Sequence, residues 1–421
     1  MKTFFKKIPT TVLAVMLLGA LSHPGLMASE NTPGDAELLK VTRKLETGQA
    51  VKIVCLGDSI TAVTLHTGNR MAWPELLDQG LRQLYPRANI KVLNAGVSGI
   101  TTPGALKNVD KEVLEPKPAL AIVMLGMNDN SSGEEKSMAA MEAIVTKIKT
   151  ANIPLMVCLQ NYASVVAPPF NDARSALLLK LQVPIVDCHS AFKLLFDEGK
   201  KTPGKWIDYQ LLMSDGIHPN LEGQRLLTQT IVKRLTQKDL PLSAIPGTQP
   251  SIPLTLSKAK EGQSLVLTVF GLDDALVLKA FRKVFSRAKI KSTPRSVKAL
   301  TWETVKKNEP AFWQQNGDDV LLVCFPEGET LPAQEYYADL SGFRRLLSQK
   351  REIVWVANSV LSNQPLTQPA AEREELMRRF ASGMDVGFIQ REAKDVRAPE
   401  EIIASWLLQQ ATLKPAPKHT R

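Results

Sequence analysis

Four short segments of the chain combine polar side chains with glycine, and their residue types suit acyl transfer. The segments are residues 57–61 (GDSIT), 94–99 (NAGVSG), 126–129 (GMND) and 215–220 (DGIHPN). Acyl transfer by a serine requires a hydroxyl nucleophile, a base that takes its proton and hydrogen-bond donors for the oxyanion. The four segments contain a residue for each of these roles.

A serine, a histidine and an aspartate in these segments form a candidate catalytic triad. Ser59 follows an apolar run at a glycine turn, which suits a nucleophile. A serine hydroxyl is inert at neutral pH without a base, and His218 is the candidate base. Asp215 lies three residues before His218, a spacing that lets its carboxylate reach the far ring nitrogen on a tight loop. We therefore expect these three side chains to meet.

Three donors are candidates for an oxyanion hole. Gly96 offers a backbone N–H without a side chain beside it, and Asn128 offers a side-chain amide. The backbone N–H of Ser59 is the third donor. Preorganised donors of this kind stabilise the charge that develops on the carbonyl oxygen.

The distribution of histidines favours His218 as the base. The chain has five, which are His23, His66, His189, His218 and His419. Only His218 has an acidic residue three positions before it and a helical pattern directly after it. Four side chains are candidates for the wall of a substrate pocket, namely His66, Arg70, Trp73 and Tyr162. The chain has no metal-binding spacing, so we expect no metal and no cofactor.

In this order, the four segments resemble the four conserved blocks of the SGNH (GDSL-type) hydrolases, over about residues 52–235. The resemblance implies a flavodoxin-like α/β/α sheet and the hydrolysis of carboxylic esters. It places the family's hallmark residues on Ser59, Gly96, Asn128 and His218, and the acid of the triad on Asp215. The G-x-S-x-G elbow of the α/β-hydrolases is not matched, because Thr61 stands where that motif has its second glycine.

Apolar strands alternate with amphipathic helices through the first half of the chain. We expect strands at 51–56, 90–93, 119–125, 153–159 and 183–188, and helices at 74–85, 134–151 and 221–235. Such an alternation indicates a parallel sheet covered on both faces, a doubly wound α/β layer. The carboxyl ends of its strands share one edge, and the four segments fall at or near strand ends.

The alternation starts again after a proline-rich stretch at residues 239–256, which we interpret as a linker. Strands are expected at 264–270, 319–325, 352–357 and 386–390, and helices at 274–285, 335–348, 372–382 and 399–410. The order mirrors the first half, so residues 257–413 are predicted to be a smaller, duplicated domain; an unrelated α/β domain is the alternative. This half has no histidine, and Asp273 stands at the position equivalent to Ser59, which indicates a degenerate copy without catalysis.

Residues 1–28 have the pattern of a secretory signal peptide. Three lysines at positions 2, 6 and 7 precede an apolar run at 11–21, and cleavage is expected near Ala28. An uncleaved membrane anchor is the alternative. We expect an exported protein, periplasmic or extracellular. A segment at 29–50 would precede the catalytic domain at 51–238, and a basic tail at 414–421 would end the chain.

The chain is basic, with a formal net charge of +10. The densest basic stretch is 279–298. We interpret it as a solvated helix face; the alternative is a surface with weak attraction to an anionic polymer or membrane. Nucleic acid is not expected, because no recognition motif accompanies the charge.

The four cysteines lie in separate strand-like runs. They are Cys55, Cys158, Cys188 and Cys324. Buried free thiols are the expectation, and a disulfide between Cys158 and Cys188 is the alternative.

Three functions fit these observations. Ester hydrolysis comes first, on a small-molecule or polysaccharide acyl ester, with carbohydrate O-deacylation favoured over lysophospholipid hydrolysis. An acyltransferase would use the same residues and exclude water. A non-catalytic binding protein would keep the four segments for folding alone.

Overall fold

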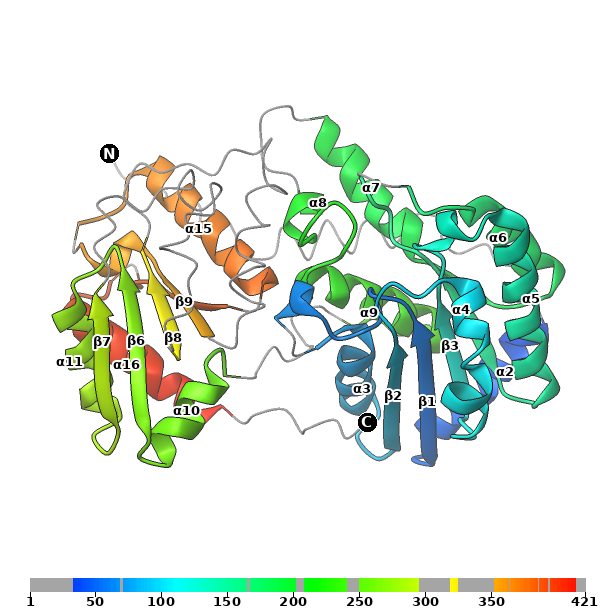
Figure 1. Cartoon of the computed structure of the whole chain (residues 1–421), viewed down its shortest axis with the longest axis horizontal. Coiled ribbons are helices and arrows are strands. Elements are labelled where there is room, and N and C mark those ends of the chain that lie inside the picture. Colours follow the sequence, from blue (N-terminus) through cyan, green and yellow to red (C-terminus); the bar gives the residue numbers. More distant parts are fainter. Residues whose placement is uncertain are drawn as a thin grey trace, which may run out of the picture.

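Two separate parallel sheets organise the chain. The computed structural model describes residues 33–68, 71–164, 167–201, 208–240, 250–294, 319–324, 352–362, 364–384, 386–392 and 394–413 of the 421. Figure 1 shows one sheet in each half of the molecule, each with helices packed against it. The predicted signal peptide at 1–28, the predicted helix at 335–348 and the basic tail lie outside the described residues.

The first sheet has five parallel strands in the order β2-β1-β3-β4-β5. The strands are β1 (Ala50–Gly57), β2 (Asn89–Gly96), β3 (Leu120–Met124), β4 (Leu155–Leu159) and β5 (Ile185–Asp187). Successive side chains of β1 enter opposite cores, because strand side chains alternate between faces: Ile53 and Cys55 pack on one side, and Val54 and Leu56 on the other.

Helices cover both faces of this sheet. One core is closed by α2 (Pro33–Glu46), α3 (Trp73–Leu84), α7 (Cys188–Lys200) and α9 (Leu221–Thr236). The other is closed by α4 (Thr102–Leu106), α5 (Glu134–Thr150) and α6 (Asn171–Lys180). A short helix, α8 (Asp208–Leu211), precedes α9. The expected three-layer α/β/α fold is therefore confirmed.

The second sheet repeats the strand order of the first. Its strands are β6 (Ser264–Phe270), β7 (Lys289–Pro294), β8 (Val320–Val323), β9 (Glu352–Val356) and β10 (Gly387–Ile389). They lie in the order β10-β9-β8-β6-β7, all parallel, so each strand has the same neighbours as its counterpart in the first sheet. The helices described here are α10 (Pro253–Lys260), α11 (Asp274–Val284), α15 (Gln368–Gly383) and α16 (Pro399–Thr412). This topology is the one that a duplicated fold requires.

Several expected boundaries differ from the structure. The basic stretch at 279–298 is not one helix face, because α11 ends at Val284 and Lys289 begins β7 at the sheet edge. Two of its lysines, Lys279 and Lys283, pair with Glu400 and Glu401 of α16. The end of the predicted linker is the first turn of α10, and α6 was not predicted.

Helix α2 packs on the first sheet, and the cysteines are reduced. Leu38, Val41 and Leu45 of α2 pack in the first core, so the segment before β1 is part of this domain. All four cysteines are buried free thiols, and no disulfide joins Cys158 to Cys188. Among the described residues, no helix is both long and apolar enough to cross a membrane.

One helix of the second half contacts the first domain. Helix α15 packs against α8 and α9 (Figure 1). The Ser382 hydroxyl donates a hydrogen bond to Glu222 Oε1 at 2.8 Å. Gly383 lies against the side chain of Asn220, where a Cβ would come within 2.4 Å of the amide nitrogen. The second domain therefore contacts the residues that begin α9, immediately after His218.

Candidate active site

Ser59 lies in the tight turn that ends β1. The turn is held by Asp58, whose carbonyl accepts hydrogen bonds from the Thr61 and Ala62 N–H groups. The buried Asp58 carboxylate accepts from the Ile60 N–H at 3.0 Å and from Gln160 Nε2 at 2.7 Å. The Gln160 contact connects the turn to the end of β4, and the Asp58 contacts together fix the conformation of the turn.

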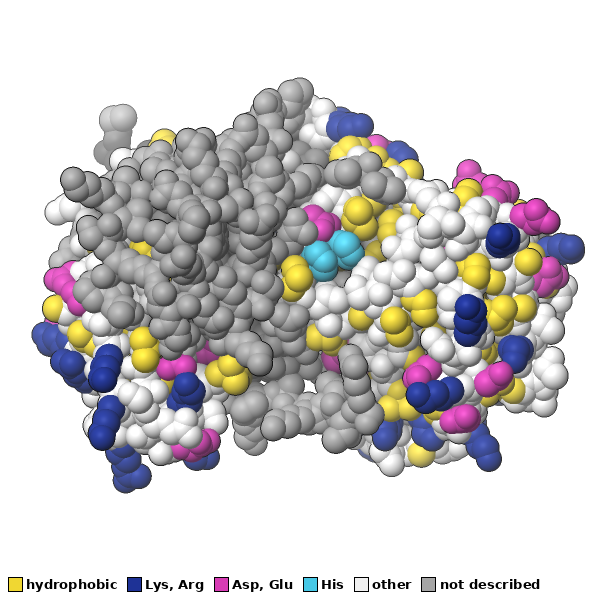
Figure 2. Space-filling model, viewed as in Figure 1, with side chains coloured by type: hydrophobic (Ala, Val, Ile, Leu, Met, Phe, Trp, Pro, Cys, Tyr) yellow, Lys and Arg dark blue, Asp and Glu magenta, His cyan; other side chains and the backbone are white. Residues whose placement is uncertain are grey.

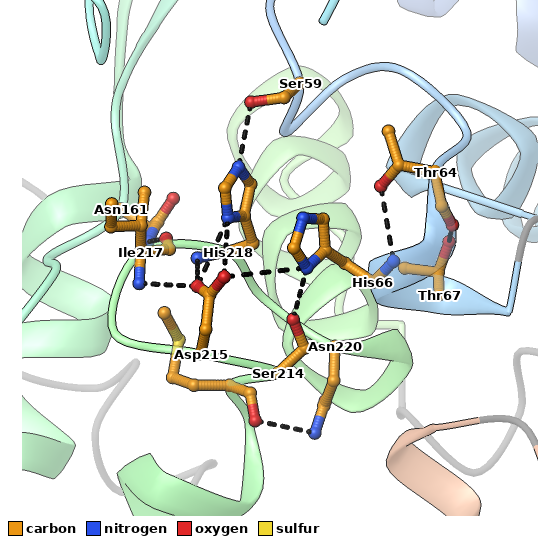
Figure 3. A network of polar contacts seen from close by, with 11 residues as sticks. Ser59, Thr64, His66, Thr67, Asn161, Ser214, Asp215, Ile217, His218 and Asn220 are labelled. Carbon is orange, nitrogen blue, oxygen red and sulfur yellow. Dashed lines mark hydrogen bonds and ion pairs between the residues drawn. The ribbon is translucent and has the colours of Figure 1, made fainter. Parts of the chain in front are cut away.

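His218 joins Ser59 to Asp215 (Figure 3). The Ser59 Oγ lies 3.0 Å from His218 Nε2, and His218 Nδ1 lies 3.1 Å from Asp215 Oδ2. The other carboxylate oxygen of Asp215 accepts from the Ile217 and His218 N–H groups at 2.8 and 2.6 Å. These contacts form a hydroxyl–imidazole–carboxylate chain, the arrangement that a serine nucleophile and its base require.

The loop that carries Asp215 and His218 is anchored on both sides. The Ser214 N–H donates to the His218 carbonyl at 2.9 Å and closes the loop. The Asn220 side chain accepts from the Glu222 and Gly223 N–H groups, which caps α9, and its amide donates to the Leu211 carbonyl. The position of the histidine is therefore set by the start of the last helix of the domain.

The environment of Asp215 keeps its carboxylate ionised. Burial raises the pKa of Asp215, but the hydrogen bonds and the positive charge of His218 outweigh burial and hold that pKa well below its usual range. An ionised carboxylate beside Nδ1 orients the imidazole.

Two of the three predicted oxyanion donors are available, and one is not. Within the described part of the chain, the Ser59 N–H has no hydrogen-bond partner. Asn128 Nδ2 donates one hydrogen to the Ile100 carbonyl at 3.0 Å, which leaves its second hydrogen. The Gly96 N–H donates to Asn94 Oδ1 at 2.9 Å. Because an N–H has a single hydrogen, the structure contradicts the prediction for Gly96.

Gly99, three residues further along the same loop, offers a replacement donor. Its φ is +76°, which favours glycine, and nothing lies within 4 Å of the position that a Cβ would take. Its N–H has no hydrogen-bond partner among the described residues, and the next residue, Ile100, is bonded to Asn128. The segment 94–99 has two glycines, and the prediction from sequence assigned the role to Gly96 and did not consider Gly99.

A buried ion pair supports the loops on this side of the site. The Arg174 guanidinium lies 2.9 Å from Asp129 Oδ2, and both side chains are 0% exposed. The same carboxylate accepts from the Thr102 N–H and hydroxyl at 2.8 and 2.7 Å. The loops after β2 and β3 and the helix α6 after β4 are therefore joined at one carboxylate, directly next to Asn128.

The four residues predicted to line a substrate pocket lie in different environments. His66 lies beside His218, whereas Trp73 is fully buried and donates its indole N–H to Thr61 Oγ1, so the prediction for Trp73 is wrong. Tyr162 is half-buried among His189, Phe196 and Tyr209. Arg70 lies outside the described residues. Histidine side chains reach the surface at one place in Figure 2, next to hydrophobic ones.

Three side chains at the site also have metal-ligand chemistry. His66, Asp215 and His218 each offer one ligand atom, and these atoms lie within 4.8 Å of one another. The two imidazoles are stacked with only 8° between their planes. Ring-nitrogen lone pairs lie in the ring plane, so two parallel rings direct them side by side and not at a common ion. The arrangement fits acid–base chemistry better than metal coordination.

Comparison with known proteins gives matches to the first domain. Residues 55–226 match the family model of the GDSL-like lipase/acylhydrolase family. A thioesterase 1/protease 1/lysophospholipase L1 from Escherichia coli (strain K12) is 28% identical over 44% of this chain and 82% of its own length. An arylesterase from Vibrio mimicus is 27% identical over 44% of this chain and 88% of its own.

Solved structures also resemble part of this chain. A two-domain esterase active on acetylated mannans, crystallised with mannopentaose, matches 49% of this chain with 21% identity and a TM-score of 0.42. This chain spans about half the length of that protein, 55% of it.

We predict that the buried ion pair is essential for stability. Removing one partner of such a pair leaves the other charge buried and costs about 3 to 5 kcal/mol. Arg174→Met and Asp129→Asn should each lower the free energy of unfolding, measured with urea, by this amount. The control is Asp110→Asn, which breaks the exposed pair between Asp110 and Lys147 and should change it little. Equal losses in Arg174→Met and in the control would contradict the prediction.

Asp58 should make the protein less stable as the pH rises. Burial raises the pKa of Asp58 to about 6, although the Ile60 N–H and the charge of His218 act to lower it. The folded state then holds a proton that the unfolded state releases near pH 4, so this contribution is fully present below pH 4 and is lost as the pH rises through about 6.

The corresponding measurement compares two proteins across pH. The shift corresponds to about 3 kcal/mol between pH 4 and pH 7, at 1.36 kcal/mol per pKa unit. Urea unfolding of the wild type and of Asp58→Asn should differ by a pH-dependent amount of this size. A constant difference between the two proteins across that range would show that Asp58 does not titrate in this way.

Proposed function

We propose that the first domain works as a serine esterase with Ser59 as nucleophile. Residues 55–226 belong to the GDSL-like lipase/acylhydrolase family, so this domain is an ester-bond hydrolase. The observation that carries the proposal is the chain of contacts from Ser59 Oγ through the His218 ring to Asp215. The comparisons concern the family, and the individual roles are assigned from these contacts.

The acylation step uses all three side chains. Ser59 Oγ attacks the carbonyl carbon of the ester while its proton passes to His218 Nε2, 3.0 Å away. The imidazolium that forms is stabilised by the ionised Asp215. The tetrahedral intermediate then expels the alcohol, which takes the proton from Nε2, and Ser59 remains acylated. Water then attacks the acyl carbon while His218 Nε2 takes its proton. The bond from that carbon to Ser59 Oγ breaks, the acid leaves, and Nε2 returns the proton to Oγ.

The oxyanion is held by the donors that the structure leaves available. We assign the Ser59 N–H, the Gly99 N–H and the second hydrogen of Asn128 Nδ2 to this role. Loss of one such donor typically costs about a hundredfold in rate. Gly96 has a different role, because its N–H and the Asn94 side chain hold the loop in place.

For the substrate, we propose an O-acylated carbohydrate met outside the cell. The N-terminal residues 1–28 have the pattern of an export signal, which supports a periplasmic or extracellular enzyme. The chain remains basic without the three lysines of residues 1–28, and this charge favours encounter with anionic polymers, including substituted polysaccharides.

A second substrate class has independent support. One similar protein is named as a thioesterase 1/protease 1/lysophospholipase L1. Lysophospholipids are therefore the competing candidate. Transfer of the acyl group to an alcohol would use the same residues and differs from hydrolysis only in the acceptor.

Three substitutions test the triad. Ser59→Ala and His218→Ala should each lower kcat by about 10⁴-fold or more, and Asp215→Asn should lower it less. The assay is hydrolysis of a chromogenic acetyl ester, with mass spectrometry of fluorophosphonate-labelled protein to locate the adduct on Ser59. Ser264→Ala, at the start of β6, is a matched control that should retain full activity. Labelling of another residue, or full activity of Ser59→Ala, would refute the assignment.

An ester panel tests the substrate class. We expect acetate release from acetylated oligosaccharides with a kcat/KM at least tenfold above fatty-acid release from lysophosphatidylcholine. An added alcohol acceptor should give no transfer product. Faster fatty-acid release would favour the lysophospholipase alternative, and accumulation of acylated acceptor would favour the transferase.

A further inference from the structure

A second histidine is stacked on the ring of His218. The two ring centroids are 3.8 Å apart and the planes differ by 8°. His66 comes from a 3-10 turn, Leu65–Thr67, in the loop between the Ser59 turn and α3. Its sequence position is far from His218, so only the fold brings the two rings together. The acylation steps above do not use it.

The His66 ring is held in place from several sides. Its Nδ1 lies 2.7 Å from Ser214 Oγ and 3.7 Å from Asp215 Oδ2 (Figure 3). The Thr64 hydroxyl accepts from the His66 N–H at 3.4 Å, and Gly68 ends the turn in the left-handed conformation. The His66 side chain is 13% exposed. These contacts fix the ring to the same loop that carries the catalytic pair.

A histidine ring needs such support when both nitrogens must act at once. The torsion between Cβ and the ring is broad and roughly two-fold, so it does not by itself select one ring orientation. Proton transfer in this site requires Nε2 at Ser59 and Nδ1 at Asp215 in the same orientation. A parallel ring at van der Waals distance blocks rotation out of that plane.

We propose that His66 is a positioning residue, which keeps the His218 imidazole in the plane that connects Asp215 to Ser59. The proposal rests on the proposed function, because it assigns His66 a part in proton transfer through His218. The flat face of the His66 ring restricts rotation of the His218 ring, and the Ser214 hydroxyl holds the His66 ring in that position. This role differs from that of a pocket wall, which would act on substrate binding.

Three variants separate the stacking from the hydrogen bond. His66→Ala removes both and should lower kcat about tenfold while KM stays unchanged. His66→Phe restores a flat ring without the ring nitrogens and should recover most of the lost kcat. Ser214→Ala removes only the hydrogen bond to the His66 ring, and its kcat should lie between those of the other two variants. The rate of fluorophosphonate labelling of Ser59 should follow kcat in all three, and urea unfolding shows whether each variant is folded.

The outcomes distinguish this inference from the proposed function. If the wild type hydrolyses no ester and is not labelled at Ser59, the proposed function fails and the role of His66 fails with it. If the wild type is active through Ser59 and His66→Ala matches it, only the role of His66 is overturned. A raised KM with unchanged kcat would make His66 a substrate contact, and a Phe variant as impaired as the Ala variant would exclude the stacking.

Discussion

The arrangement of the site depends on one carboxylate that has no access to water. Asp129 is surrounded by the Arg174 guanidinium and by the N–H and hydroxyl of Thr102. A buried charge is tolerated only when its partners satisfy it, so these groups cannot separate without a large penalty. The three chain segments that carry them come from successive strand ends, and the ion pair fixes their spacing. The loop that ends in Thr102 contains Gly99, and Asn128 precedes Asp129.

The proposed base, His218, is held by a different set of interactions. His218 and Asp215 belong to a loop closed by its own backbone and anchored by Asn220 at the start of α9. Ser59 belongs to the turn after β1, where the buried Asp58 organises the backbone. The site is therefore a junction of independently supported parts. The proposed oxyanion donors, nucleophile and base each keep their position through contacts that involve no substrate.

Much of this could be predicted from the sequence, because the local signals were strong. Apolar runs such as the one before Gly57 gave the strands, and the rule that parallel strands share a carboxyl edge brought Ser59 and Asn128 to one side. Four features could not be predicted. The choice between Gly96 and Gly99 depends on which N–H remains unpaired, which is a property of the folded loop. Trp73 is buried because Thr61 and α9 enclose it. Strand β7 was missed in the sequence because its lysines alternate with few apolar residues. The stacking of His66 on His218 joins loops with no local sequence relation.

The contact between Gly383 and Asn220 has a consequence for how such a molecule can change over evolutionary time. A side chain at position 383 would collide with the amide that caps α9, so the tolerance of the second half for mutation is limited by the catalytic half. The end of α15 is therefore constrained by its contact with the first domain, whatever changes occur elsewhere in the second half. The two halves are therefore expected to diverge as a matched pair, with compensating replacements across this contact.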